Sequence, residues 1–254
     1  MRTLAIANQK GGSGKTTTSV NLAAALGEKE RRVLLLDLDP QHSATAWYGV
    51  NNAGKGVLGL FVEGGELADF VQGTATPGVD LIPSSAWLVG VEKILAGEVG
   101  AETILRRHLA GLPRDRWDYV LMDCPPTLGV LTVNALAAAR ELLVPVEAHV
   151  MALSGLAQLL HTVEVVQQRL NPELHVSGIL ACRVDGRTRH AREVVERLRE
   201  RSGSLVYQTV IRENIRLAEC PSFGQPITQY DPRSAGASDY RALAAEVIRQ
   251  EGRK

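Results

Sequence analysis

One stretch near the start of the chain restricts its possible folds more than any other. A short apolar run, residues 4–7, leads directly into the string NQKGGSGKTT at positions 8–17, and apolar residues at helical spacing follow. Glycines at 11, 12 and 14 let the backbone curl until successive N–H groups point at an anion, and the start of a helix adds its positive dipole end. The stretch therefore predicts a strand, a phosphate-binding loop and a helix in succession.

Two side chains of this loop are suited to a nucleotide carrying magnesium. Lys15 supplies a cation to the β- and γ-phosphates, and the Thr16 hydroxyl can ligate the Mg²⁺ that bridges them. A glycine-rich turn with solvated lysines is the alternative. We expect ATP and Mg²⁺ as cofactors, and the loop residues expected to bind the nucleotide are Gln9, Lys10, Gly11, Gly12, Ser13, Gly14, Lys15, Thr16 and Thr17.

Apolar runs alternate with helical patterns along the whole chain. Runs that are apolar throughout are typical of strands buried on both faces, as in a parallel sheet covered by helices. We therefore predict an α/β fold, a doubly wound, mostly parallel sheet with helices on both faces, in a single domain over residues 1–254. Residues 49–78 hold eight of the 24 glycines and are expected to be irregular. The expected strands are 4–7, 33–36, 79–82, 119–122, 142–146 and 176–181, and the expected helices are 16–28, 101–110, 129–140, 154–170, 188–201 and 238–250.

Two further strands end in carboxylates. The run 33–36 is followed by Asp37 and Asp39, and the run 119–122 by Asp123. Open α/β sheets hold their ligands at this edge, where a carboxylate can orient an attacking water or hold a metal-bound one. Asp37 is expected either to support the site or only to cap its strand. The residues expected at the metal are Thr16, Asp39 and Asp123.

The string KGGSGKTT, with a lysine at position 10 and Gln9 where the ordinary pattern has glycine, resembles the deviant Walker A motif of the ParA/MinD family. The resemblance to the chromosomal ParA (Soj) branch covers essentially the full chain. It departs from the family at Ser13, at His42, at His149-Val150, which replaces an aromatic pair, and at Arg212-Glu213, where Pro-Arg is usual. The segments that carry it are DLDPQ at 37–41, DCPPT at 123–127, ALSGL at 152–156, DGRT at 185–188 and YDPRS at 230–234.

This resemblance implies a P-loop NTPase of the deviant Walker A type that hydrolyses ATP slowly and is stimulated by a partner. Lys10 would reach across a dimer interface to the partner's nucleotide, so that ATP binding drives homodimerisation. The position matching Asp39 is the one required for hydrolysis, and Asp123 matches the Walker B aspartate. The catalytic set implied is Lys10, Lys15 and Asp39, and the adenine contacts implied are Ile211, Arg212 and Asn214.

A basic segment contrasts with the neutral chain, whose formal net charge is zero. Residues 183–216 contain nine arginines against five acidic residues. Arginines can neutralise DNA phosphates without reading sequence. A solvated helix face whose charges pair at i,i+4 is the alternative. The family resemblance implies non-specific DNA binding by Arg187 and Arg216, and Arg189 is an additional candidate.

The favoured function is a DNA-partitioning ATPase for a chromosome or plasmid. Its ATP-bound sandwich dimer would bind double-stranded DNA non-specifically, and a ParB-like protein would stimulate hydrolysis and release. The alternatives are a MinD-like or cargo-positioning ATPase acting on a membrane or a protein assembly, and a catalyst such as a reductase or a small-molecule ligase. Residues 250–254 lack the amphipathic character of a membrane anchor, and the three cysteines lack cluster-binding spacing.

The same features suggest a location. Three widely spaced cysteines fit a reducing compartment, and the apolar run at 4–7 is too short for a signal peptide. We expect a cytoplasmic, nucleoid-associated protein with no membrane partner. Because the phosphate loop begins within ten residues of Met1, we expect no separate operator-binding domain ahead of it.

Overall fold

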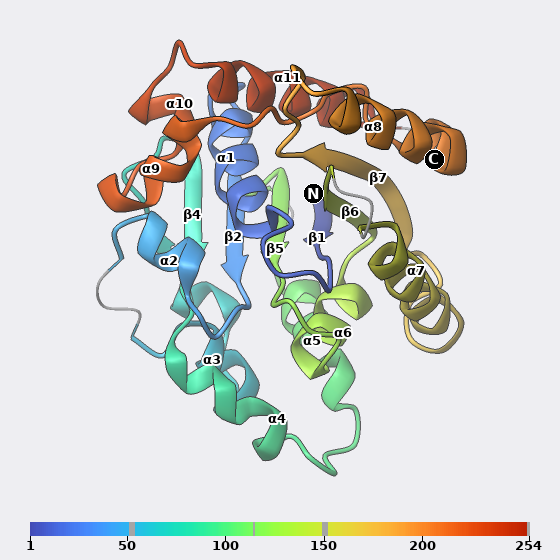
Figure 1. Cartoon of the computed structure of the whole chain (residues 1–254). Helices are drawn as coiled ribbons and strands as arrows, with labels where there is room; N and C mark the ends of the chain where they lie inside the picture. Colours follow the sequence, from blue (N-terminus) through green and yellow to red (C-terminus); the bar gives the residue numbers. More distant parts are fainter. Residues whose placement is uncertain (51–53, 114, 149–151, 253–254) are drawn as a thin grey trace.

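A seven-stranded sheet in the order β3-β4-β2-β5-β1-β6-β7 forms the centre of the computed structural model (Figure 1). The structure describes residues 1–50, 54–113, 115–148 and 152–252, with no side-chain detail at 152–154, so the departure at His149-Val150 lies outside the described residues. The strands are β1 (Arg2–Ile6), β2 (Val33–Asp37), β3 (Gln72–Gly73), β4 (Val79–Ile82), β5 (Tyr119–Asp123), β6 (Glu141–Glu147) and β7 (His175–Cys182).

The six predicted strands all form, and every pair among them is parallel. The short β3 is the addition, and it pairs antiparallel with β4 at the edge. Strand β1 lies between β5 and β6, so the chain passes from β1 to one side of the sheet and later returns to the other. Such a switch point opens a crevice at the carboxyl ends of the strands, and the glycine loop follows β1 there.

Helices cover both faces, which confirms the doubly wound architecture. Alternate residues of each strand face opposite sides, so Leu35 and Leu121 enter one apolar core while Leu34 and Val120 enter the other. The first core is covered by α1 (Lys15–Gly27), α2 (Ser43–Trp47), α9 (Ile215–Phe223) and α11 (Ala235–Arg249), joined by α10 (Ile227–Tyr230). The second is covered by α3 (Gly56–Val62), α4 (Val91–Ile94), α5 (Ile104–Ala110), α6 (Val130–Ala138), α7 (Ala152–Arg169) and α8 (Arg189–Ser202).

The expectation of an irregular segment at 49–78 is wrong for the part that the structure describes. Residues 54–78 contain α3, a 3₁₀ turn over Leu67–Phe70 and β3. Each element is too short to show a periodic pattern, and some of the glycines allow close packing: a Cβ at Gly59 would collide with the ring of Phe70. The predicted helix 101–110 also begins as a 3₁₀ turn, over Ala101–Thr103, before α5.

Replacing Gly56 with alanine is expected to lower the free energy of unfolding by about 2–4 kcal/mol. Gly56 has a left-handed φ of 45°, and a Cβ there would collide with the backbone carbonyl oxygen of Pro83, which also accepts the Val57 N–H at 2.9 Å. Backbone cannot move aside as a flexible side chain can. Urea unfolding measures the change. Gly73→Ala is the matched control, because a Cβ at Gly73 meets nothing within 4 Å; an equal loss in both variants would contradict the argument.

Candidate functional site

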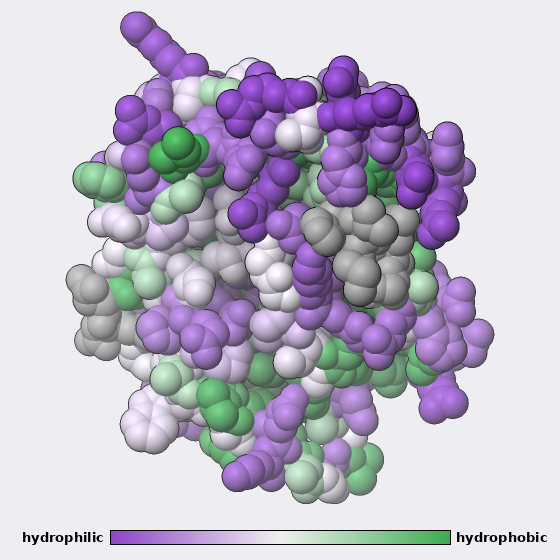
Figure 2. All heavy atoms as spheres, in the orientation of Figure 1, coloured by the Kyte–Doolittle hydropathy of each residue, from purple (hydrophilic) through white to green (hydrophobic). Residues whose placement is uncertain are grey.

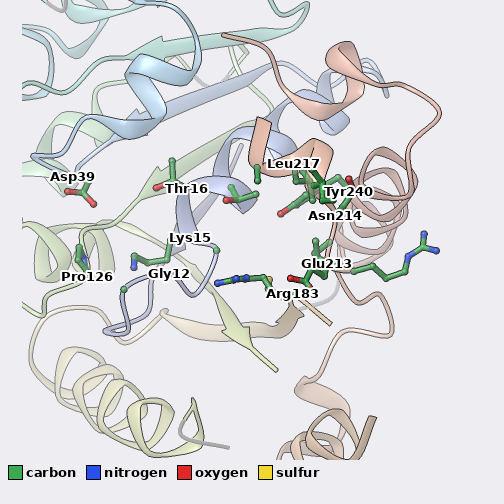
Figure 3. A pocket seen from close by; sticks show the side chains of 18 residues that line it. Gly12, Lys15, Thr16, Asp39, Pro126, Arg183, Glu213, Asn214, Leu217 and Tyr240 are labelled. Carbon is green, nitrogen blue, oxygen red and sulfur yellow. The ribbon is translucent and has the colours of Figure 1, made fainter. Parts of the chain in front are cut away.

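The glycine loop forms one wall of a pocket of about 520 Å³, a size suited to a nucleotide. Gly12 and Gly14 adopt left-handed φ angles of 76° and 92°, and α1 begins at Lys15. The N-terminal end of α1 therefore borders the pocket, which Lys15, Thr16 and Thr17 help to line (Figure 3). A Cβ at Gly14 would lie 3.5 Å from the Cys182 side chain, so the loop rests against the end of β7. The local backbone is that of an anion-binding loop.

Lys15 is the cation at the centre of this pocket. Its residue is only 7% exposed, and its Nζ donates to the Lys10 carbonyl at 3.3 Å. Burial lowers the pKa of Lys15, and the carboxylates of Asp123 and Asp39 oppose that shift. A partly desolvated ammonium attracts phosphate more strongly than one in water.

Asp123 presents the carboxylate that fits a metal ion. It is fully buried; its Oδ1 accepts the Ser19 hydroxyl at 2.9 Å, and its Oδ2 has no hydrogen-bond partner. Burial and the neighbouring charge of Asp37 raise the pKa of Asp123, whereas the Thr16 and Ser19 hydroxyls favour its charged form. An uncompensated buried oxygen beside the first turn of α1 suits a cation, so Thr16 and Asp123 fit Mg²⁺.

The described residues contain no group of three or more His, Cys, Asp or Glu side chains suited to a metal. Mg²⁺ is commonly held by one or two protein ligands together with phosphates and water, so this does not conflict with the proposed pair. Sequence reasoning missed Ser19. Its signal was its position four residues after Lys15, on the same face of α1, where its hydroxyl also donates to the Lys15 carbonyl at 3.0 Å.

Asp39 lines the same pocket, at the opposite end from Asn214, Leu217 and Tyr240 (Figure 3). Its carboxylate accepts the Gln41 N–H at 2.9 Å, and the Ser84 hydroxyl donates to its carbonyl at 2.8 Å. These contacts shape the turn that carries Asp39. The side chain remains available at the pocket, as a residue that positions a water molecule must be.

Asp37 has a structural position. It is fully buried, and its Oδ2 accepts both the backbone N–H and the hydroxyl of Thr45, at 2.8 and 2.7 Å. Its Oδ1 accepts the Asp39 N–H at 3.2 Å. Asp37 thus fixes the turn between β2 and α2, which fits both expectations for it, a support for the site and a cap for its strand.

Lys10 does not enter the pocket beside Lys15. Its Nζ lies 2.9 Å from Glu147, whose other carboxylate oxygen lies 3.2 Å from Arg183. The Lys10 side chain is 37% exposed, so it is accessible at the mouth of the loop. Arg183 lines the pocket and was not predicted as a site residue. No motif marks it, because its position depends on how β7 pairs with β6. The two remaining loop residues differ in burial: Gln9 is half-buried, whereas Ser13 is buried.

Ile211, Arg212 and Asn214, the residues expected to contact adenine, line the same pocket as the glycine loop. Their side chains differ in availability. Arg212 is held by Asp239 at 2.6 Å, and Asn214 caps α9 by accepting the Arg216 N–H at 2.8 Å. Leu217 and Tyr240, which sequence reasoning missed, supply apolar surface there. A base would therefore contact apolar groups and backbone more than the Arg212 guanidinium.

The predicted DNA-binding arginines are exposed, and two of them share a groove. Arg187 and Arg216 line a groove next to the pocket. Glu213 and Asn214 line both the groove and the pocket. Arg187 pairs with Asp185 at 2.9 Å and Arg216 with Glu219 at 2.9 Å. Arg189 instead begins α8 and pairs with Glu193 at 2.7 Å. Polar and charged side chains cover the upper part of the face in Figure 2, over α8 and α11.

No helix among the described residues is long and apolar enough to cross a bilayer. A protein-family profile described as "AAA domain" matches residues 1–176.

Comparison with known proteins identifies the relatives. The chain is 44% identical over 246 residues to the sporulation initiation inhibitor protein Soj of Bacillus subtilis, covering 96% of this chain and 97% of that protein. It is 49% identical to the chromosome-partitioning ATPase Soj of Thermus thermophilus, covering 98% and 96%. A similar solved structure is that of cobyrinic acid a,c-diamide synthase from Mycobacterium smegmatis with bound ADP and magnesium, at 37% identity and a TM-score of 0.86, covering 98% and 95%. With this loop, these strand-end aspartates and these relatives, the chain belongs to the ParA/Soj family of P-loop ATPases, within the ParA/MinD superfamily.

Proposed function

We propose that this chain is a DNA-partitioning ATPase, acting as one domain over residues 1–254, whose ATP-bound dimer binds DNA without sequence preference. The observation that carries the proposal is the division of labour between two lysines of one loop. Lys15 is buried at the pocket, whereas Lys10 lies at the mouth, accessible to a second subunit. A lysine in this position can contact the nucleotide bound by a partner subunit, and that contact would couple ATP binding to dimerisation.

The pocket residues account for the chemistry. Thr16 and Asp123 would hold Mg²⁺, which when bound neutralises charge on the phosphates. The backbone N–H groups from Gly11 to Thr16 and the Lys15 ammonium would fix the phosphate chain. Asp39 would orient the attacking water. Because phosphoryl transfer needs mainly positioning and charge stabilisation, these groups suffice for slow hydrolysis, and a ParB-like partner would accelerate it by completing the arrangement.

The shared groove supports DNA as the surface on which the dimer acts. Arg187 and Arg216 line this groove, which is continuous with the pocket rim at Arg212, Glu213 and Asn214. A change in the rim on nucleotide binding could therefore alter the spacing of the two guanidinium groups. Each exchanges a surface carboxylate for a DNA phosphate at little cost, because exposed ion pairs are weak. We place the protein in the cytoplasm, on the nucleoid.

A second candidate is a small-molecule ligase, because the structural relative with bound ADP and magnesium is named a diamide synthase. Relatives of higher identity include two proteins named Soj, one of which is a chromosome-partitioning ATPase, which favours the first proposal. The two differ in what they require: a ligase hydrolyses ATP in step with an acid substrate and an amide donor, whereas a partitioning ATPase responds to DNA and a protein partner.

DNA binding tests the proposal. We expect the wild type to bind long duplex DNA only with Mg-ATP, and Arg187→Ala/Arg216→Ala to weaken binding tenfold or more and to flatten its salt dependence, because fewer counterions are released. Lys10→Ala should fail to bind DNA even with Mg-ATP, since only the dimer presents two grooves at once. Electrophoretic mobility shift at two salt concentrations measures these effects.

The matched control is Arg32→Ala/Arg241→Ala. Both arginines also pair with surface carboxylates, Asp118 and Glu28, away from the groove. DNA binding that is independent of nucleotide, or equal in the two double variants, would overturn the assignment of the groove. If ATP drives dimerisation but no form binds DNA, vesicles of anionic lipid and protein assemblies become the surfaces to test.

A further inference from the structure

One carboxylate at the mouth of the phosphate loop holds two cations. Glu147 ends β6, and its two oxygens lie 2.9 Å from Lys10 Nζ and 3.2 Å from Arg183 Nη1. Lys10 lies at the start of the glycine loop. Arg183 lies far from Lys10 along the chain and directly follows β7. Parallel pairing of β6 with β7, which sets Glu147 opposite Cys182, brings the three side chains together.

Arg183 occupies this place in an unusual backbone conformation. Its φ is 54°, in the left-handed region that residues with a Cβ avoid. Such a conformation persists where the surrounding structure enforces it, and it is frequent at ligand sites. Here it turns the chain out of β7 and aims the side chain across the pocket, toward Gly12 and Lys15 (Figure 3).

The charges around the pocket indicate that the Arg183 guanidinium can bind phosphate. Asp39 and Glu213 are acidic residues of the lining, Glu147 pairs with Arg183, and the Asp123 carboxylate acts on Lys15, the buried cation of the loop. Under the proposed function Lys10 serves the partner's nucleotide. Of these two lysines of one subunit, only Lys15 would then contact the phosphate chain of the nucleotide bound in that subunit, which carries several negative charges. Arg183 is the other cationic side chain on the loop side of the pocket lining, and guanidinium binds phosphate oxygens in pairs.

We propose that Arg183 binds the phosphate chain of the nucleotide in its own subunit, and that Glu147 competes with that phosphate chain for Arg183 and with the partner's nucleotide for Lys10. The proposal rests on the proposed function in that the pocket must bind ATP. Glu147 is then a positioning residue that sets how readily both cations reach phosphate. The side chain of Arg183 is 58% exposed and its ion pair is correspondingly weak, so the exchange requires no rearrangement of the fold.

Isothermal titration calorimetry with Mg-ATP tests the proposal in variants of the two partners of one ion pair, Arg183 and Glu147. Arg183→Met should weaken ATP binding about tenfold, as expected for loss of a charge-assisted hydrogen bond, and Arg183→Lys should fall between. Glu147→Gln should tighten binding by about threefold, because it frees both cations. Opposite signs are the diagnostic result, since an ion pair that served only the fold would shift both variants in the same direction.

Two further variants keep the test decisive. Arg183→Gly removes the side chain while suiting the left-handed backbone, so its ATP affinity should match that of Arg183→Met even if the methionine variant is less stable. Arg32→Met, which breaks a comparably exposed pair with Asp118, should leave the affinity unchanged. Binding within twofold of the wild type in both Arg183→Met and Arg183→Gly, or weaker binding in Glu147→Gln, would overturn the proposal. A wild type that binds no ATP would overturn the proposed function itself.

Discussion

Asp39→Ala is expected to lower the rate of ATP hydrolysis about a hundredfold or more while leaving ATP bound. Asp39 lines the pocket, and its turn is fixed independently by Asp37 and Ser84. Loss of the side chain would therefore remove the group that we propose to orient water, without removing the phosphate loop. Phosphate release in single-turnover and steady-state assays measures the rate.

The same variant should stay on DNA, because ATP that is not hydrolysed keeps the dimer closed. Asp115→Ala, at an exposed position, is the control and should hydrolyse ATP like the wild type. An Asp39→Ala protein that hydrolyses ATP within threefold of the wild type would remove Asp39 from the catalytic set. One that fails to bind ATP would show instead that Asp39 serves the nucleotide or its metal ion.

Lys15→Gln should weaken Mg-ATP binding by about a hundredfold, the larger of the expected effects on affinity. Lys15 is the buried ammonium of the loop, and in that surrounding its attraction to phosphate is weakly screened. The fold should tolerate the change, because burial already disfavours the charged lysine, as its lowered pKa indicates. Isothermal titration measures the affinity, and urea unfolding without nucleotide measures the stability.

Lys29→Gln is the matched control, since Lys29 is exposed after the end of α1. The comparison separates a charge lost from the pocket from a charge lost from the chain. Nucleotide affinity that is equal in the two glutamine variants would place the phosphates elsewhere. A Lys15→Gln protein that unfolds much more easily would mean that the lysine chiefly neutralises Asp39 and Asp123.

The sequence predicts the parts of this molecule that depend on local pattern. The six strands and the glycine loop follow from apolar runs and turn chemistry, and Asp39 and Asp123 follow from strand ends. Helices α9 and α10 were not predicted: α9 is short and contains Pro221, and α10 has only four residues. Their place is set by packing against α1, α2 and α11, not by a periodic pattern.

The rest of the candidate site depends on contacts between distant segments. Ser19 meets Asp123, and Glu147 meets Arg183, only because the strands pair in a particular order. Arg212 was predicted to contact adenine, and it lines the pocket, but the structure also engages its guanidinium with Asp239. None of these three contacts can be inferred from spacing along the chain.

The pairing of β2 with β5 matches Val33 to Tyr119 and continues in step to Asp37 and Asp123. The separation of the two carboxylates is therefore inherited from a ladder of main-chain hydrogen bonds. Adding or deleting one residue within either strand would turn every later side chain to the opposite face. The number of residues from Val33 to Asp39 is therefore fixed by the place that Asp39 takes in the pocket lining.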